Sequence, residues 1–128
     1  MIGELLLHVL GDYATQSDWM AQEKRRSWVP ASVHAVVYTV PFVLLTQSIP
    51  ALLTMCLTHA VIDHYRLARY VVWVKNFLGP KKFWPRPWGQ CTYTGYNPDV
   101  PPYMSVWLMI IVDNLMHVTI NAGALRWL

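Results

Sequence analysis

Apolar residues recur at helical spacing along four segments of the chain, and polar or proline-containing turns separate these segments. Residues 2–24 predict an amphipathic helix that is partly inserted in a membrane. Residues 30–47 predict a second helix, kinked at Pro41. Residues 51–77 predict a third helix. Residues 103–122 predict a fourth, which at roughly 20 residues is long enough to cross a bilayer.

A segment rich in proline and aromatic residues separates the third and fourth predicted helices. Residues 79–102 contain six of the nine prolines, so we expect an interfacial loop or cap there. Pro50 is expected in the first turn of the third helix, where proline is tolerated. The pattern predicts an all-α fold, in which residues 1–128 form a single domain, a four-helix bundle that is membrane-embedded or membrane-docked.

The composition supports a membrane protein. Hydrophobic residues make up 55% of the 128 residues and charged residues 13%, about half the usual charged fraction of soluble domains. Basic residues follow the first and third predicted helices, whereas the turn between the second and third has no charge. We therefore expect an integral protein of the bacterial inner membrane, or of the membrane of a phage-infected host, with the basic ends cytoplasmic. The first residues lack a basic segment, so no cleavable signal peptide is expected.

Several common kinds of site find no support in the sequence. The two cysteines, Cys56 and Cys91, lie far apart and form no Cys-x-x-Cys motif. The chain has no phosphate-binding glycine-rich loop, no Gly-x-Ser-x-Gly elbow, no dinucleotide fingerprint and no His-Glu-x-x-His motif. These absences weaken the case for a nucleotide-triphosphate enzyme or a serine hydrolase, and no nucleic-acid partner is evident.

Histidine and aspartate form three pairs in which the two residues stand four positions apart, so each pair lies on one helix face. Random placement would give roughly 0.4 such pairs. His34 adds a residue from the second helix, so that every predicted helix contributes to the interior, as in bundles that hold metals in their cores. The predicted metal ligands are His8, Asp12, His34, His59, Asp63, Asp113 and His117.

This set predicts a divalent metal site. Imidazole and carboxylate ligands without thiolate suit zinc, manganese, iron or nickel more than copper(I), and the set could hold one or two ions. Zinc is the expected ion. An ionisable group costs about 2.5–3.5 kcal/mol at the centre of a membrane helix, so several of them need a compensating ion or hydrogen bonds. Two other interpretations stay open: a purely structural network of polar residues, and a path for protons or ions.

A bound metal also predicts roles for its neighbours. Asp12 and Asp63 are the candidate catalytic carboxylates, either as ligands or as the general base for a metal-activated water. A basic surface favours an anionic substrate. The candidate substrate-binding residues are Gln16, one turn beyond Asp12, His64, and the basic residues Arg66 and Arg69.

Four segments carry a resemblance to a known family: residues 5–16, 34–38, 58–63 and 113–117. Through them the chain resembles small phage and bacterial membrane proteins that are grouped as a domain of unknown function, and it is distantly similar to membrane-bound metal-dependent hydrolases. The resemblance covers nearly the whole chain outside residues 79–102. It implies metal binding through His8, Asp12, His34, His59 and Asp63, with Asp113 and His117 completing the site.

These observations predict a zinc-dependent, membrane-bound hydrolase that acts on a phosphoester or lipid-like substrate. Two alternatives remain: a non-enzymatic phage or bacterial membrane protein that binds a host partner, and an ion or proton relay. The expected partners are membrane lipid and an anionic small-molecule or lipid substrate, and an oligomer is compatible with the sequence.

Overall fold

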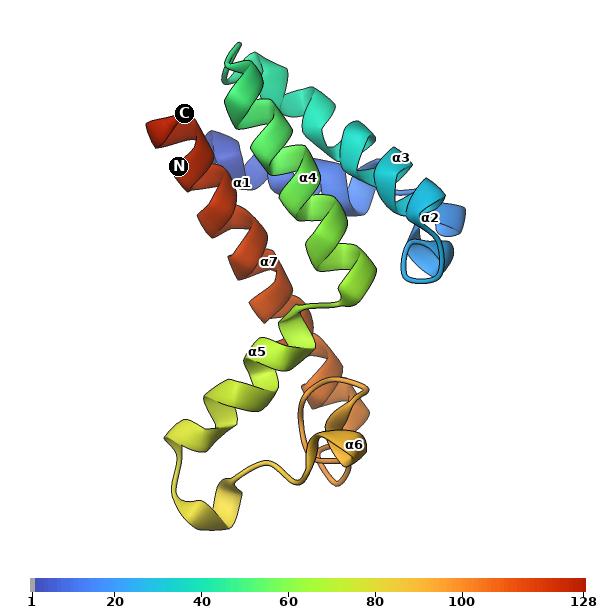
Figure 1. Ribbon diagram of the computed structural model, residues 1–128, viewed down its shortest axis with the longest axis vertical. Coiled ribbons are helices and arrows are strands. Elements are labelled where there is room, and N and C mark those ends of the chain that lie inside the picture. Colours follow the sequence, from blue (N-terminus) through green and yellow to red (C-terminus); the bar gives the residue numbers. More distant parts are fainter. Residues whose placement is uncertain (1) are drawn as a thin grey trace. The chain divides into compact units, whose positions relative to one another are not determined.

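A computed structural model describes residues 2–128 and divides the chain into two compact units, which are described separately below (Figure 1). The first unit comprises residues 1–65 with 117–128, and the second comprises residues 66–116. Within residues 2–128 the secondary structure consists of seven α-helices and short π- and 3-10-helical pieces, with no strand. The predicted all-α class is confirmed. The single domain over residues 1–128 stays a prediction.

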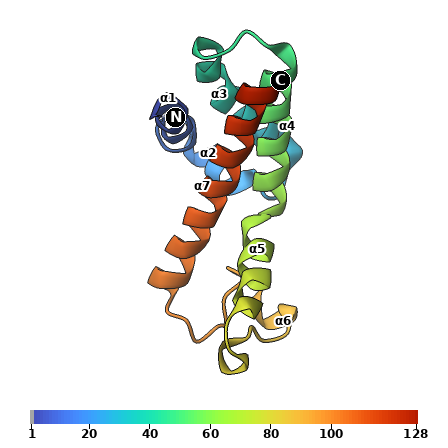
Figure 2. The same ribbon diagram turned by 90° about the vertical axis from the view of Figure 1, so that its left-hand side faces the viewer.

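The first unit contains the elements that hold most of the paired histidines and aspartates. Its longest helices, α3, α4 and the end of α7, pack around a core, and Figures 1 and 2 both place α4 beside α7. The elements are α1 (Ile2–Val9), η1 (Leu10–Ala14), α2 (Asp18–Glu23), α3 (Trp28–Thr39), η2 (Val40–Leu44), α4 (Ile49–Tyr65) and the C-terminal part of α7 (Pro102–Trp127).

The prediction of one helix over residues 2–24 is wrong, because α1 passes into η1 and the helix ends at Ala14, before α2 begins. The piece η1 is a π-helical turn, closed by a hydrogen bond from the Thr15 amide to the Leu10 carbonyl at 3.1 Å. Gly11 permits this turn to lie against α3, since a Cβ at this position would come within 2.6 Å of the Tyr38 ring. The chain then restarts as α2, whose first turn is capped by the Ser17 side chain.

The second and third predicted helices exist, but neither is one continuous α-helix. The kink expected at Pro41 is a switch from α3 to the 3-10 helix η2. Pro50 lies in the first turn of α4, as predicted. A continuous helix over residues 51–77 is wrong, because Arg66 adopts a φ of +51°, a left-handed conformation that ends α4.

The hydrophobic core of the first unit lies at one end of the polar cluster described below. Its members come from α3, η2, α4 and α7, and they are Tyr38, Phe42, Ala51, Met55 and Ala124. Tyr38 belongs both to this core and to the polar cluster, so packing of the core fixes the position of the polar side chains around it.

The second unit is built around α5 (Ala68–Lys75), η3 (Asn76–Leu78), η4 (Lys81–Phe83), α6 (Trp88–Cys91) and the start of α7. Apart from the first residue of α7, the expected loop over residues 79–102 holds only two short helical pieces, η4 of three residues and α6 of four. Gly95, at φ +85°, packs directly on α5, because a Cβ there would lie 2.1 Å from the Arg69 carbonyl oxygen. Trp73 Nε1 donates a hydrogen bond to the Arg86 carbonyl at 3.0 Å and ties α5 to this loop.

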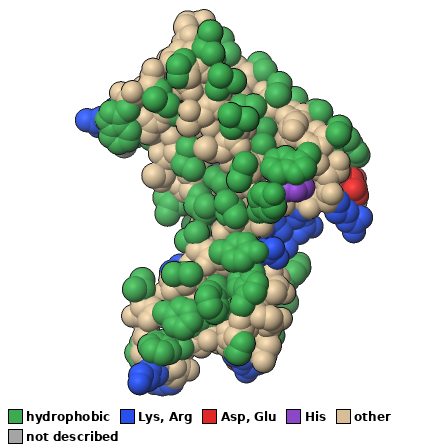
Figure 3. All heavy atoms as spheres, in the orientation of Figure 1, with side chains coloured by type: hydrophobic (Ala, Val, Ile, Leu, Met, Phe, Trp, Pro, Cys, Tyr) green, Lys and Arg blue, Asp and Glu red, His purple; other side chains and the backbone are tan. Residues whose placement is uncertain are grey.

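Many large hydrophobic side chains are exposed. Figure 3 shows them spread over the face of the first unit that it displays. Within residues 2–128, α7 is the one helix that is both long enough and apolar enough to cross a membrane, and residues Trp28–Leu44 form a shorter apolar segment. The fourth predicted helix is therefore confirmed as a helix and as a candidate span. The membrane-embedded bundle stays a prediction.

Candidate metal centre

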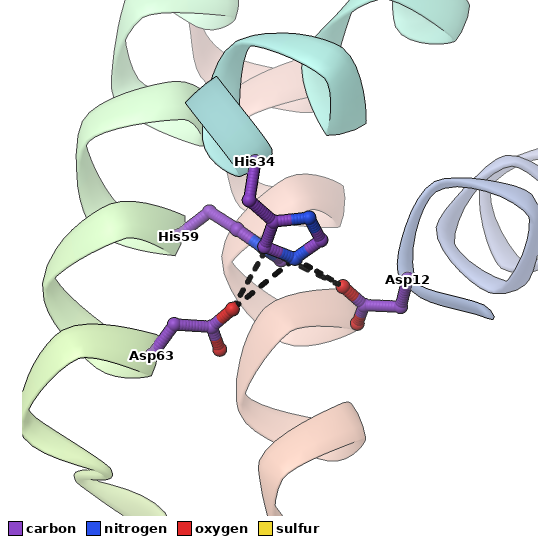
Figure 4. Close-up of side chains that lie close together, drawn as sticks. All are labelled: Asp12, His34, His59 and Asp63. Atoms are coloured by element: carbon purple, nitrogen blue, oxygen red, sulfur yellow. Dashed lines mark hydrogen bonds and ion pairs between the residues drawn. The ribbon is translucent and has the colours of Figure 1, made fainter. Parts of the chain in front are cut away.

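Four buried side chains from three elements of the first unit point toward one another (Figure 4). Asp12 comes from η1, His34 from α3, and His59 with Asp63 from α4. The Nε2 atoms of the two histidines are 2.9 Å apart. Each Nε2 lies 3.3 Å from Asp12 Oδ1 and 3.2 Å from Asp63 Oδ2.

Most of these separations are close to those of a tetrahedral metal site. Ligands about 2.0–2.1 Å from a zinc ion at tetrahedral angles are about 3.3–3.4 Å from one another. Five of the six separations among the four atoms lie between 2.9 and 3.3 Å. The sixth, between the two carboxylates, is within 4.8 Å. The donor set of two imidazole nitrogens and two carboxylate oxygens is one that zinc accepts.

A single proton between the two imidazoles does not satisfy all four atoms. Because the two Nε2 atoms are 2.9 Å apart, only one of them can carry the hydrogen that lies between them. The other presents a lone pair to two carboxylate oxygens, which also present lone pairs. In addition, Asp12 Oδ1 is buried and has no hydrogen-bond partner within residues 2–128. A cation between the four atoms would turn these repulsive contacts into attractive ones.

Both carboxylates are held in their charged form. Burial would raise the pKa of Asp12, but His34 and His59 beside it outweigh this effect and lower the pKa. Burial would likewise raise the pKa of Asp63, yet contacts with His117, His34 and His59 hold it well below its ordinary value. Both carboxylates therefore favour the ionised form in this cluster.

The two imidazoles differ in proton affinity. Burial lowers the pKa of His59, and the Asp63 carboxylate offsets this only in part. Burial also acts to lower the pKa of His34, but its contacts with both Asp12 and Asp63 outweigh burial and raise the pKa. His34 is thus the imidazole that holds a proton more readily, and His59 is the better neutral ligand.

Two further predicted ligands, His8 and His117, lie one layer outside the four converging atoms. His8 Nε2 is 3.6 Å from Asp12 Oδ2, and His117 Nε2 is 3.3 Å from Asp63 Oδ1. Each carboxylate therefore turns one oxygen to the centre and the other to an outer histidine. Contacts of this kind commonly orient carboxylate ligands and tune metal affinity, and the predicted role of His8 and His117 as ligands themselves stays a prediction.

Tyr38 and Asn121 belong to the site, although the sequence interpretation gave them no role. The Tyr38 ring stacks on His59 with centroids 3.7 Å apart. Its hydroxyl contacts His8 Nδ1 at 2.9 Å and accepts a hydrogen bond from Asn121 Nδ2 at 2.5 Å. Their spacing in the sequence could have indicated this role, because Tyr38 stands four residues after His34, and Asn121 four residues after His117, on the same helix faces.

Lys24 is the other residue that the sequence interpretation missed. In the sequence it is only one of the basic residues that follow the first predicted helix, yet its Nζ donates a hydrogen bond to Asp63 Oδ2 at 2.6 Å. The two residues are 39 positions apart, so no local spacing in the sequence predicts this ion pair.

The proposed substrate residues Gln16 and His64 have structural contacts. Gln16 Nε2 donates to the backbone carbonyl of Asp12 at 2.8 Å and so closes the π-helical turn. His64 Nδ1 contacts the Lys24 carbonyl at 2.8 Å, and its ring stacks on Trp28. Both residues therefore position parts of the centre, and their contact with a substrate stays a prediction.

The remaining predicted site residues lie in the second unit. Arg69 donates to the Thr92 carbonyl at 2.9 Å, and Arg66 lies over the Tyr93 ring. Asp113 stands one turn before His117 on α7. Roles for Arg66 and Arg69 in substrate binding, and for Asp113 in metal binding, stay predictions.

Comparison with protein-family models matches residues 1–124 to the family described as "Protein of unknown function (DUF3307)". The chain belongs to this family. The match runs across both compact units and includes all four converging side chains. Searches of curated proteins and of solved structures give no match. The expected membership in a domain family of unknown function is confirmed. The distant similarity to membrane-bound hydrolases stays a prediction.

Proposed function

We propose that this protein binds a single divalent metal ion, zinc, through Asp12, His34, His59 and Asp63. The observation that supports this proposal is the convergence of four buried donor atoms at separations suited to a tetrahedral ion. The two carboxylate charges would offset those of the ion, so the loaded centre would be neutral if both imidazoles are neutral.

We further propose that the metal serves hydrolysis. Catalytic zinc sites commonly use two histidines and one carboxylate and keep a further position for water. His34, His59 and Asp63 supply such a set from the regular helices α3 and α4. A divalent ion held there supplies a Lewis acid that polarises the bond to be cleaved and acidifies water.

Of the four proposed ligands, Asp12 is the one that we expect to yield its position to water, which makes it the best candidate for the proton acceptor. It stands on a π-helical turn, a feature often found at functional sites, rather than on a regular helix. Its Oδ1 points into the centre without a hydrogen bond within residues 2–128, while His8 lies beside its other oxygen. An ionised carboxylate in this position can take a proton from water.

The preferred substrate is a phosphoester or a lipid-like anionic molecule. The support is electrostatic, since Lys24 brings an ammonium group to the centre and Arg25 and Arg26 follow it on the same turn.

The hydrolase proposal is tested by separating metal binding from catalysis. Asp12→Asn is expected to keep part of its zinc and to lose hydrolysis of bis(4-nitrophenyl) phosphate and of phospholipid vesicles. Asp63→Asn is expected to lose both zinc and activity. A zinc-loaded wild type that hydrolyses none of these esters would refute the hydrolase, while leaving the metal site in place.

A second candidate function is non-enzymatic: the polar cluster holds together a membrane protein that binds a host partner. The observation in its favour is that Asp63 already has a cation, Lys24, and an outer histidine, His117, as partners. This function predicts a stable, metal-free wild type whose partner binding survives replacement of His34 or His59 by glutamine.

We also propose that the protein is bound to a membrane, with α7 as the candidate span. The second unit, described by itself, has six Lys and Arg against two Asp, and several of these cations lie over exposed aromatic rings. Basic and aromatic residues together are typical of segments at the surface of an anionic membrane. Recovery of the expressed protein in the membrane fraction after alkaline carbonate extraction supports this proposal, and recovery in the soluble fraction contradicts it.

A further inference from the structure

Lys24 already places a positive charge at the proposed metal centre. Its Nζ is 2.6 Å from Asp63 Oδ2, the same oxygen that lies 3.2 Å from both histidine Nε2 atoms. The Lys24 side chain is 18% exposed, whereas that of Asp63 is 4% exposed. The ammonium therefore reaches the centre from its more open side.

The backbone of Lys24 is held in place for this contact. Lys24 ends α2, and its amide donates a hydrogen bond to the Met20 carbonyl. Its own carbonyl contacts His64 Nδ1 at 2.8 Å, and the His64 ring stacks on Trp28 with centroids 4.0 Å apart. Because His64 follows Asp63 directly, the same turn of α4 fixes both ends of Lys24.

A metal ion and the Lys24 ammonium compete for one oxygen. An ion bound about 2.0–2.2 Å from Asp63 Oδ2 would lie within roughly 4.8 Å of Nζ if Lys24 stayed in place. Two cations at this distance in a buried setting repel each other strongly. The ion and the ammonium cannot both bind Asp63 Oδ2 closely, so binding of the ion favours release of the Lys24 side chain.

We propose that Lys24 is a built-in competitor for the metal: its ammonium neutralises Asp63 when no metal is bound, and a divalent ion must displace it toward solvent. This inference rests on the proposed metal site and adds a control on that site. The centre then has two states, one with Lys24 paired to Asp63 and one with metal bound and Lys24 released. Lys24 lowers the metal affinity of a donor set that would otherwise bind zinc more tightly.

The first test compares zinc affinity among three proteins by competition with a chromophoric chelator. Lys24→Met keeps the length of the apolar side chain and removes the charge. Arg25→Met is the matched control, because it removes one positive charge from the same turn at an exposed position. We expect zinc to bind Lys24→Met at least about tenfold more tightly than wild type, and Arg25→Met within about twofold of wild type.

The outcomes separate this inference from the metal proposal. Zinc binding of equal strength in wild type and Lys24→Met, or weaker in the variant, overturns the role of Lys24 alone. Binding by Lys24→Met but not by wild type supports it. Absence of zinc binding in both overturns the metal site, and the inference with it.

A second test uses the wild-type chain, so it does not depend on how the variant folds. Amine acetylation followed by mass spectrometry measures how readily each lysine reacts. We expect zinc to raise the acetylation rate of Lys24 severalfold, while the exposed Lys81 reacts at an unchanged rate. An unchanged or slower reaction of Lys24 in the zinc-loaded protein contradicts its displacement.

Discussion

Gly11→Ala should lower both the stability and the metal affinity of the protein, because the added methyl group would collide with Tyr38, which packs against the centre. The new Cβ would lie 2.6 Å from Tyr38 Cδ2 and 3.2 Å from the Tyr38 carbonyl oxygen, so one side must move by about 1 Å to reach an ordinary contact. Tyr38 is fully buried, stacked on His59 and hydrogen-bonded by Asn121. The π-helical turn is therefore the part expected to move.

The magnitude follows from that displacement. Overpacking costs about 1–3 kcal/mol, and the better helix propensity of alanine returns up to about 1 kcal/mol. At about 0.27 kcal/mol per kelvin for 128 residues, a net loss of about 1–2 kcal/mol lowers Tm by about 4–7 °C. Asp12, the next residue, would withdraw from its 3.3 Å contacts with the imidazoles. A loss of about 10–100-fold in zinc affinity is then expected.

Differential scanning calorimetry and a zinc titration measure the two effects. Gly3→Ala is the control in the same unit, since a Cβ there meets only the Leu45 side chain at an ordinary 3.7 Å. This control should keep the Tm and the zinc affinity of wild type. A Gly11→Ala protein with wild-type Tm and zinc affinity would refute the reasoning that the tight turn holds Asp12 in place.

Three further predictions follow from other contacts. Without metal, the lowered pKa of Asp63 means that its ionised form stabilises the fold at pH values above the ordinary pKa near 4. This stabilisation is lost as the pH falls through the lower pKa of the folded state. Acid titration followed by circular dichroism should therefore show unfolding that begins below about pH 4. With zinc, affinity should fall as pH drops through the range where His34 binds a proton, which its raised pKa places above the ordinary imidazole value; a pH-independent affinity would contradict the ligand role of His34. Gly95→Ala should destabilise the second unit by about 3 kcal/mol or more, because the new Cβ would meet the Arg69 carbonyl at 2.1 Å in a left-handed backbone. The hydrogen-exchange rate of the α5 amides should then rise. Unchanged protection of these amides from exchange would exclude this packing argument.

The sequence predicted those features that depend on periodicity. The apolar runs predict helices close to α3, α4 and α7, and the spacing of four between His59 and Asp63 places both on one face of α4, where the structure shows them. Four of the seven predicted metal ligands converge in the structure, and two more lie against their carboxylates.

The features that depend on backbone exceptions and on distant pairing could not be predicted. The periodic pattern of residues 2–24 continues through the π-helical turn, so it does not reveal that Gly11 packs on Tyr38. Arg66 adopts a left-handed conformation that its residue type does not indicate. Lys24 looks like one of three basic residues in a turn, and only the tertiary fold shows that its ammonium reaches Asp63.

The central claim, that four side chains of the first unit hold one divalent ion, is tested most directly by the metal content of the purified chain. Plasma mass spectrometry would compare wild type, Asp63→Asn and, as a control carboxylate, the exposed Asp99→Asn. About one equivalent of zinc in wild type and Asp99→Asn, with its loss from Asp63→Asn, is the result we predict. A folded wild type that stays metal-free after incubation with zinc and removal of excess ion would contradict the claim.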